Sequence, residues 1–214
     1  MPCDHFDWLA PFYDRAIRRF SDLEKMSALA DLPTPGHNST GLRRGRSGER
    51  SARRTATNSV RRLLDVGGGT GRVAEALRGQ AGQIVVADLS LGMLRQAGGK
   101  DGLQPVCAYS EKLPFPDASF DRVIMVDALH HVVDQAQTGR ELWRVVRPGG
   151  RIVIQEPDVR VFAVKLIAFF EKLALMRSHF LPPAKIADLF PVEPACITIE
   201  SENLTAWVAL DKGL

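Results

Sequence analysis

The chain has 214 residues, of which 45% are hydrophobic and 25% charged, a composition typical of a globular protein with one full-sized core. No apolar run approaches the ~18 residues that cross a bilayer, and the N-terminus lacks a secretory pattern, so we expect a cytoplasmic protein without a transmembrane segment. The three cysteines, Cys3, Cys107 and Cys196, are too scattered for a disulfide framework or a zinc site, and no metal is predicted.

The net charge of +3 conceals an uneven distribution. Positions 42–62 hold eight arginines and one acid, Glu49, so this segment carries +7 and the rest of the chain −4. A basic nucleic-acid-binding face on the domain itself is therefore not expected.

The first 32 residues are predicted to form an N-terminal helical cap. Apolar residues recur at helical spacing, and Pro11 predicts a break before a helix from about 12 to 30. This helix either only packs on the main domain or places Phe12, Tyr13 and Asp14 over an active site.

Residues 33–59 are predicted to be a flexible linker or insertion. They are rich in Arg, Gly, Ser and Thr and almost devoid of apolar residues, so burial cannot offset the entropy of ordering them. A basic tail that contacts phosphate or an anionic membrane is the alternative.

Residues 60–214 are predicted to form one α/β domain. Short apolar runs at 63–66, 84–88, 104–108, 121–126 and 151–155 read as strands, with helical patterns at 70–78, 90–97 and 134–146 between them. Such alternation predicts a parallel sheet with helices on both faces. An apolar helix at 159–176 and a short helix at 183–189 follow, and then two strands, 196–202 and 205–210, that form an antiparallel hairpin at the sheet edge.

A glycine turn joins the first strand to the next helix in the run Asp65-Val66-Gly67-Gly68-Gly69-Thr70-Gly71. Glycine permits positive φ and close approach of a ligand, and a helix start attracts phosphate or carboxylate. Asp65 disfavours a pyrophosphate there and favours a cation such as an ammonium or sulfonium. Asp88, which ends the next strand, is placed to accept hydrogen bonds from a ribose diol. Together these residues predict a ligand with a ribose and a zwitterionic amino-acid tail.

A dinucleotide-binding turn is the competing interpretation of the same glycines. The pattern that starts at Gly67 fails at Arg72, where the third glycine belongs, although the frame from Gly69 to Ala74 fits a relaxed form. The acid at Asp65 argues against it.

Four blocks of the sequence resemble the class I S-adenosylmethionine-dependent methyltransferases. Residues 65–71 match the D/E-x-G-x-G-x-G motif of that family, and three later blocks are similar to its ubiquinone/menaquinone C-methyltransferase-like branch: 85–94, 110–121 and 141–150. The resemblance covers about residues 61–157. It implies a Rossmann-like fold with a seven-stranded, mostly parallel sheet, S-adenosyl-L-methionine as cofactor, S-adenosyl-L-homocysteine as its product, and a small-molecule methyl acceptor.

The resemblance also implies which residues bind the cofactor. The glycines would approach its methionine part, Asp65 would organise that pocket, and Asp127 would flank the sulfonium. Asp88 would hold the ribose, with the remaining side chains around the adenine. The full set is Asp65, Gly67, Gly69, Gly71, Asp88, Leu89, Met93, Ser110, Glu111 and Asp127.

One departure from the family lies beside the expected adenine. Many relatives have Asp-Ala-Glu before Leu-Pro-Phe, whereas this chain has Tyr109-Ser110-Glu111. The loss of the acid leaves the adenine amino group without its usual partner, so Tyr109 or Ser110 must take its place, and lower cofactor affinity is expected.

The methyl acceptor is expected beside residues 127–131, which follow the fourth strand. Alignment of the reactants drives an in-line methyl transfer, and a base is needed only if the acceptor loses a proton. No catalytic residue is assigned; the candidates are His130, His131 and Tyr13, and either histidine could instead cap the loop. The apolar stretch 161–175 is a buried helix or a lid, and a lid would suit a quinone-like or lipid-like acceptor.

The sequence thus predicts methyl transfer from S-adenosylmethionine to a small apolar or quinone-like molecule. Two alternatives remain open: a non-catalytic cofactor-binding scaffold of the same fold, and an RNA methyltransferase recruited by the basic segment. The sequence predicts no oligomeric state.

Overall fold

The computed structural model describes residues 22–33, 60–162, 164–165, 178–190 and 194–214. Most of the predicted cap, including Tyr13, nearly all of the predicted linker and most of the predicted helix 159–176 lie outside the described residues. Within the described part, no helix combines the length and apolar character that a bilayer span requires.

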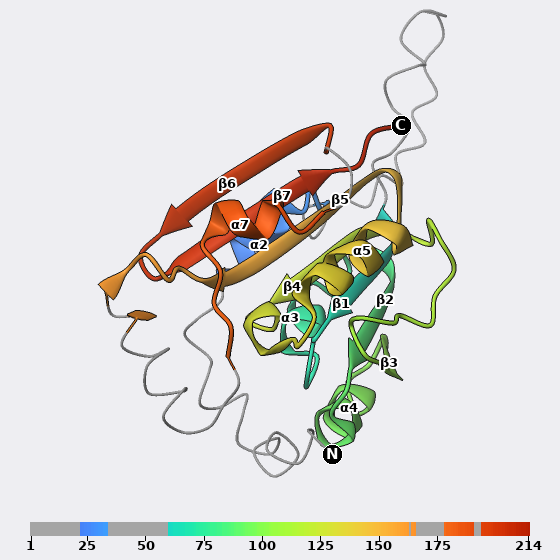
Figure 1. Ribbon diagram of the computed structural model, residues 1–214. Helices are drawn as coiled ribbons and strands as arrows, with labels where there is room; N and C mark the ends of the chain where they lie inside the picture. Colours follow the sequence, from blue (N-terminus) through green and yellow to red (C-terminus); the bar gives the residue numbers. More distant parts are fainter. Residues whose placement is uncertain (1–21, 34–59, 163, 166–177, 191–193) are drawn as a thin grey trace, which may run out of the picture.

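A single seven-stranded sheet forms the centre of the molecule, with the strand order β3-β2-β1-β4-β5-β7-β6 (Figure 1). The first five strands pair in parallel, β7 joins β5 in antiparallel orientation, and β6 and β7 form an antiparallel hairpin at one edge. The predicted fold class and the terminal hairpin are therefore confirmed. The strands are β1 (Val60–Val66), β2 (Ala81–Asp88), β3 (Leu103–Cys107), β4 (Phe120–Val126), β5 (Val146–Pro157), β6 (Cys196–Glu202) and β7 (Thr205–Asp211).

Helices cover both faces of this sheet. One apolar core lies between the sheet and α5 and α7, and a second lies between its other face and α2, α3 and α4. In Figure 1, α5 and α7 lie in front of the sheet and α2 behind it. The helices are α2 (Leu23–Leu29), α3 (Arg72–Ala76), α4 (Leu91–Gly98), the 3-10 turn η1 (Leu129–His131), α5 (Gln135–Val145) and α7 (Pro183–Ala187).

Local sequence signals explain where several helices begin. The side chains of Asp22, Ser90 and Asp134 each accept a hydrogen bond from a backbone N–H three residues later, at the starts of α2, α4 and α5. Helix α3 is shorter than the predicted 70–78, because Gly71 before it has φ +72° and Gly79 shortly after it has φ +88°.

Several strands depart from the predicted boundaries: β1 begins at Val60 rather than 63 and β2 at Ala81 rather than 84. Strand β5 begins at Val146 rather than 151, because Val146 already pairs with Phe120 and an irregularity in register follows. Strand β3 contains Pro105, which it tolerates because it is the edge strand opposite β6.

Two arginines of neighbouring strands hold the C-terminal end of α2. Arg122 Nε donates to the carbonyl oxygen of Ala30 (2.6 Å) and Arg151 Nη1 donates to that of Leu29 (2.9 Å). The two arginines are register partners in β4 and β5. They satisfy carbonyl groups that a helix end leaves unpaired, and so fix residues 22–33 to the middle of the sheet.

Candidate active site

A pocket of about 270 Å³ opens at the carboxyl ends of the parallel strands. Its walls come from the turns that follow β1, β2, β3 and β4, four strands that are neighbours in the sheet. Ligands of open α/β sheets bind at this edge.

The glycine turn after β1 forms the floor of the pocket. Gly67 and Gly69 have φ of +68° and +55°, in the left-handed region that favours glycine. A Cβ on Gly67 would lie 2.5 Å from Cβ of Ala128, so the turn after β1 touches the turn after β4 only because residue 67 has no side chain.

Asp65 is a buried carboxylate that forms no ion pair or well-formed hydrogen bond with the rest of the described residues. Its side chain is 1% exposed and lines the pocket, and neither carboxylate oxygen receives a hydrogen bond from the described residues. Burial, reinforced by the charge of Asp88 and opposed by that of Arg72, raises the pKa of Asp65 to about 7. A cationic group in the pocket would supply the partner that this carboxylate lacks, which fits the ammonium of an amino-acid tail.

Asp88 is held by the backbone of two turns. One carboxylate oxygen accepts a hydrogen bond from the N–H of Gly69 and the other from the N–H of Ser90, both at 2.8 Å. Each carboxylate oxygen can accept more than one hydrogen bond, as the binding of a ribose diol would require. The carboxylate is thus fixed in direction before any ligand arrives.

Asp127 stands at the end of β4 in an unusual backbone conformation, with φ +50°. Burial, with a contribution from the charge of Glu156, raises the pKa of Asp127 to about 6, and the charges of His130 and Arg72 and a hydrogen bond with Gln155 oppose that rise. Its pocket-facing position brings it into the same site as Asp65 and Asp88.

Glu156 fixes the turn that carries Asp127. It is 3% exposed, and its Oε1 accepts hydrogen bonds from the N–H groups of Ala128 (3.0 Å) and Leu129 (2.7 Å). Its Oε2 lies 2.6 Å from Nδ1 of His130, whose ring stacks on Phe180. His130 is therefore a buried support of this turn and does not line the pocket.

His131 is the histidine that lines the pocket. Burial, with the charge of His130, lowers the pKa of His131 to about 3. The imidazole is consequently neutral at physiological pH, and its Nδ1 lies 3.5 Å from the hydroxyl of Ser178.

The turn after β3 closes the far end of the pocket through Tyr109, Ser110 and Glu111. The Ser110 hydroxyl donates to Oε2 of Glu111 (3.2 Å) and lies 3.1 Å from the hydroxyl of Thr138, a fully buried residue of α5.

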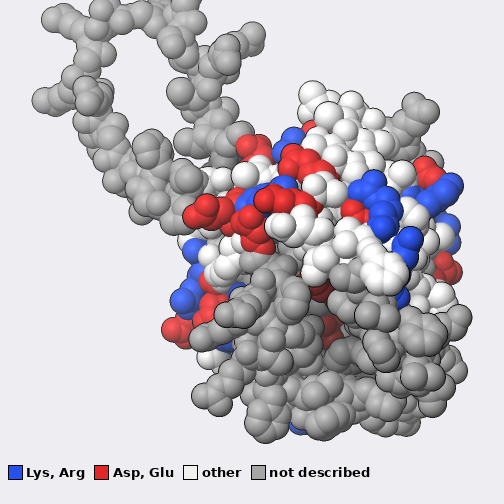
Figure 2. Space-filling model, turned by 90° about the vertical axis from the view of Figure 1, so that its left-hand side faces the viewer, with Lys and Arg blue, Asp and Glu red and all other residues white. Residues whose placement is uncertain are grey.

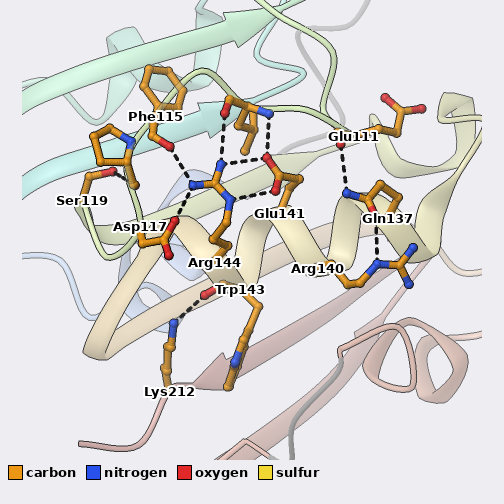
Figure 3. A network of polar contacts seen from close by, with 12 residues as sticks. Glu111, Phe115, Asp117, Ser119, Gln137, Arg140, Glu141, Trp143, Arg144 and Lys212 are labelled. Carbon is orange, nitrogen blue, oxygen red and sulfur yellow. Dashed lines mark hydrogen bonds and ion pairs between the residues drawn. The ribbon is translucent and has the colours of Figure 1, made fainter.

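Side chains of helix α5 form hydrogen bonds with backbone groups in the rest of this loop (Figure 3). The carboxylate of Glu141 accepts the N–H of Leu113 (2.8 Å), and the guanidinium of Arg144 donates to the carbonyl oxygens of Leu113 (3.0 Å) and Phe115 (2.7 Å). Arg144 also pairs with Glu141 and with Asp117. Loop and helix are thereby joined at several points.

The pocket gathers nearly all of the predicted cofactor residues. Its lining includes Asp65, Gly67, Gly69, Asp88, Leu89, Met93, Ser110, Glu111 and Asp127. Gly71 is the exception: a Cβ there would lie 2.7 Å from Leu103 Cδ1, so this glycine serves the packing of the turn on β3. Tyr13 lies outside the described residues.

Several residues of the site were not predicted from the sequence. Arg72 lines the pocket, although in the sequence it served only to reject the dinucleotide pattern. Glu156 follows the predicted fifth strand by one residue, and an acid at the end of a buried strand was the available signal for it. Thr138 gave no signal, because a threonine within a helix is common on a surface.

Comparison with known proteins shows matches to methyltransferases. Residues 64–154 match the family model described as "Methyltransferase domain". The ubiquinone/menaquinone biosynthesis C-methyltransferase of Hahella chejuensis is 40% identical over 104 residues, which cover 44% of this chain and 42% of that protein. A demethylmenaquinone methyltransferase of Corynebacterium urealyticum is 35% identical over 159 residues, 74% of this chain and 66% of that protein. The chain therefore spans less than two thirds of the length of these relatives.

Solved structures show the same fold at lower sequence identity. A methyltransferase in complex with the Trm112 methyltransferase activator of Haloferax volcanii has a TM-score of 0.71 at 16% identity, with 98% of both chains covered. An S-adenosylmethionine-dependent methyltransferase from Thermotoga maritima, described as a possible histamine N-methyltransferase, has a TM-score of 0.64 at 20% identity, covering 71% of this chain and 81% of that chain.

Proposed function

Because residues 64–154 belong to the methyltransferase-domain family, we propose that this protein transfers a methyl group from S-adenosylmethionine to a small, apolar or quinone-like acceptor. The observation that carries the proposal is the pair of acids at the pocket. Asp65 is buried and has no hydrogen-bond partner among the described residues, which suits a cation, and Asp88 is oriented by two backbone N–H groups, which suits a ribose diol.

Different residues of the pocket would bind different parts of the cofactor. When bound, S-adenosylmethionine supplies a methyl group made electrophilic by its sulfonium. Asp65 would pair with the ammonium, Asp88 would bind the ribose hydroxyls, and Asp127, held by Glu156 and its turn, would lie beside the sulfonium. Rigid supports of this kind place reactants in line, the main source of acceleration for such a displacement.

A quinone-like acceptor is supported by the relatives and by the rim of the pocket. The Corynebacterium urealyticum relative is named for demethylmenaquinone, and the rim of the pocket here includes Val132 and Val133, the latter 81% exposed. His131, which is neutral and lines the pocket, would lie beside the acceptor.

The two alternatives have less support. The three acids would serve a non-catalytic cofactor-binding scaffold as well as an enzyme, and what favours the enzyme is that the relatives are named as methyltransferases. For the RNA methyltransferase, the described part of the face in Figure 2 carries interspersed basic and acidic side chains, which does not favour a polyanion on the domain itself. The basic segment 42–62 on which this alternative rests lies mostly outside the described residues. A cytoplasmic location stays a prediction.

Calorimetry with S-adenosylmethionine and S-adenosylhomocysteine tests the proposal. We expect the wild type to bind both, and Asp88→Ala to lose about tenfold or more in affinity, since it removes hydrogen bonds to a charged group. Asp88→Asn should lose less, because it keeps one acceptor oxygen. Asp101→Ala, an exposed acid outside the pocket, is the matched control and should bind as the wild type does. No binding by the wild type would overturn the proposal.

A further inference from the structure

The sheet order indicates which end of the pocket receives the base of a nucleoside ligand. The turns after β4, β1, β2 and β3 follow one another along the pocket, so Asp127, Asp65, Asp88 and Ser110 lie in that sequence. If Asp65 takes a cationic tail and Asp88 a ribose, the base lies beyond Asp88, against the turn after β3. That turn has no acid before Glu111 that could accept a hydrogen bond from an amino group.

Ser110 and two neighbouring side chains form a hydrogen-bond chain with a fixed direction. The Ser110 hydroxyl donates its single proton to the carboxylate of Glu111. The hydroxyl of Ser110 therefore cannot also donate to Thr138, and the 3.1 Å contact between them must have Thr138 as the donor. The chain runs from Thr138 to Ser110 to Glu111, and it leaves Ser110 Oγ with one lone pair and no proton to offer a ligand.

Helix α5 keeps this chain in place. Thr138 is 0% exposed, and on the same helix Gln137 donates to the carbonyl oxygen of Glu111 (3.2 Å), while Glu141 and Arg144 hold the following residues of the loop (Figure 3). Tyr109, by contrast, is 54% exposed, so water competes for its phenol. Of the two residues that could replace the missing acid, Ser110 is the one with a fixed acceptor.

We propose that Ser110 is a specificity-determining residue that accepts a hydrogen bond from the exocyclic amino group of the cofactor's purine, with Thr138 as the positioning residue that sets its direction. This inference rests on the proposed function. It predicts that the pocket prefers a 6-amino purine to a 6-oxo purine, because an oxo group would face the Ser110 lone pair with no proton between them.

The test compares two ligands on each protein: S-adenosylhomocysteine and its deaminated analogue, S-inosylhomocysteine. We expect the wild type to bind the adenosyl compound about tenfold more tightly or better, the size of one hydrogen bond replaced by an unpaired acceptor. Ser110→Ala should reduce this ratio to within about threefold, and Thr138→Val should reduce it in part. Both ligands are measured on the same sample, so incomplete folding of a variant lowers both signals and leaves the ratio intact.

Two controls separate Ser110 from its neighbours. Ser119→Ala removes another hydroxyl of the same loop, one that donates to the carbonyl oxygen of Pro116 and does not line the pocket, and it should keep the wild-type ratio. Tyr109→Phe should also keep it. A wild type that binds S-adenosylhomocysteine without discrimination, or a ratio lost in Tyr109→Phe and kept in Ser110→Ala, would overturn this inference and leave the proposed function standing. A wild type that binds neither ligand would overturn both.

Discussion

The three carboxylates of the pocket differ in how their charge is supported. Asp88 accepts hydrogen bonds from two backbone N–H groups and Asp127 has one with Gln155. Asp65 has no well-formed hydrogen bond with the described residues, although the backbone N–H of Ala74 weakly opposes the rise of its pKa. The acid with the least support is also the one whose pKa is raised furthest, to about 7. An unliganded protein therefore carries Asp65 partly protonated near neutral pH, and a bound cation would favour its ionised form.

This difference predicts a pH dependence of binding. Between pH 6 and pH 8 the wild type should bind S-adenosylhomocysteine progressively more tightly, because Asp65 loses its proton and becomes able to pair with the ammonium. Asp65→Asn should lose about tenfold or more in affinity at pH 8, the range for a hydrogen bond to a charged group. Calorimetry at both pH values measures this. Asp188→Asn, an exposed acid paired only with Lys185 among the described residues, should retain the wild-type profile, and a pH-independent wild type would contradict the prediction.

The same carboxylate should make the unliganded fold less stable at higher pH. Because the pKa of Asp65 is higher in the folded state than its ordinary value of 3.8, the folded protein holds a proton that the unfolded chain has released. The contribution of Asp65 to the free energy of unfolding is fully present below about pH 4 and is lost as the pH rises towards 7.

Individual site residues could be predicted from the sequence where an acidic residue also stands at a telling position relative to the strands and glycines. Asp65 and Asp88 end two apolar strands, and their positions relative to the glycines indicated their surroundings before the structure was known. Thr138 and Glu156 could not be placed, because their roles depend on contacts with residues 28 positions away in the chain. The position of Arg72 after the glycines was known from the sequence, but whether its side chain lines the pocket depends on the conformation of the turn.

Among the elements, α5 has a double function, since one of its faces completes the core and another holds the loop after β3. Arg144 joins the two through hydrogen bonds to Leu113, Phe115, Asp117 and Glu141. The hydrogen bonds from Arg144 and the N–H of Leu113 lower the pKa of Glu141, which keeps its carboxylate an acceptor at neutral pH.

Removal of this arginine should loosen the loop. We expect Arg144→Ala to lower the free energy of unfolding by about 2 kcal/mol, since partly buried carbonyl oxygens and Glu141 lose a charged donor. Arg140→Ala, one turn earlier and exposed, should cost less than about 0.5 kcal/mol, as is usual for surface contacts. Urea denaturation of both variants measures the difference. Equal losses would show that the loop does not depend on Arg144.

Element boundaries were less predictable than element types. The hydrophobic pattern gave the type and order of the elements in the described parallel region and the hairpin. It missed the early start of β5, whose first residues, around Pro148 and the two glycines after it, carry no apolar alternation and pair through the backbone alone.

Contacts between α2 and the sheet join parts of the molecule that are distant in the chain. Besides its bond to Ala30, Arg122 pairs with Asp31 (3.0 Å), and Lys25 pairs with Glu200 and Glu202 of the edge strand. Residues from the start, middle and end of the chain thus meet on one side of the sheet, away from the pocket. Sequence patterns could not show this arrangement, because it depends on long-range pairing of single charges.

Loss of Arg122 should release α2 without disturbing the pocket. We expect Arg122→Leu to lower the free energy of unfolding by about 2 kcal/mol, because the carbonyl oxygen of Ala30 loses its charged donor. Hydrogen exchange at the amides of residues 30–32 should quicken, while affinity for S-adenosylhomocysteine stays within about threefold. Arg78→Leu, an exposed arginine that bonds only to the carbonyl oxygen of Asp101 among the described residues, is the control. Unchanged exchange at residues 30–32 in Arg122→Leu would contradict the prediction.

The contact between Gly67 and Ala128 has a consequence for how this sequence can change over generations. A methyl group at position 67 would lie 2.5 Å from the side chain of Ala128, so the two positions form one steric unit although they are 61 positions apart in the chain. Any side chain at 67 becomes tolerable only after 128 has lost its own, and even then the positive φ disfavours it. The two sites are thus epistatic, and a larger residue at 128 is accessible only while 67 stays glycine and the turn after β4 can shift. Steric contact between positions 67 and 128 therefore limits which substitutions can occur at the centre of the pocket, independently of any role in binding.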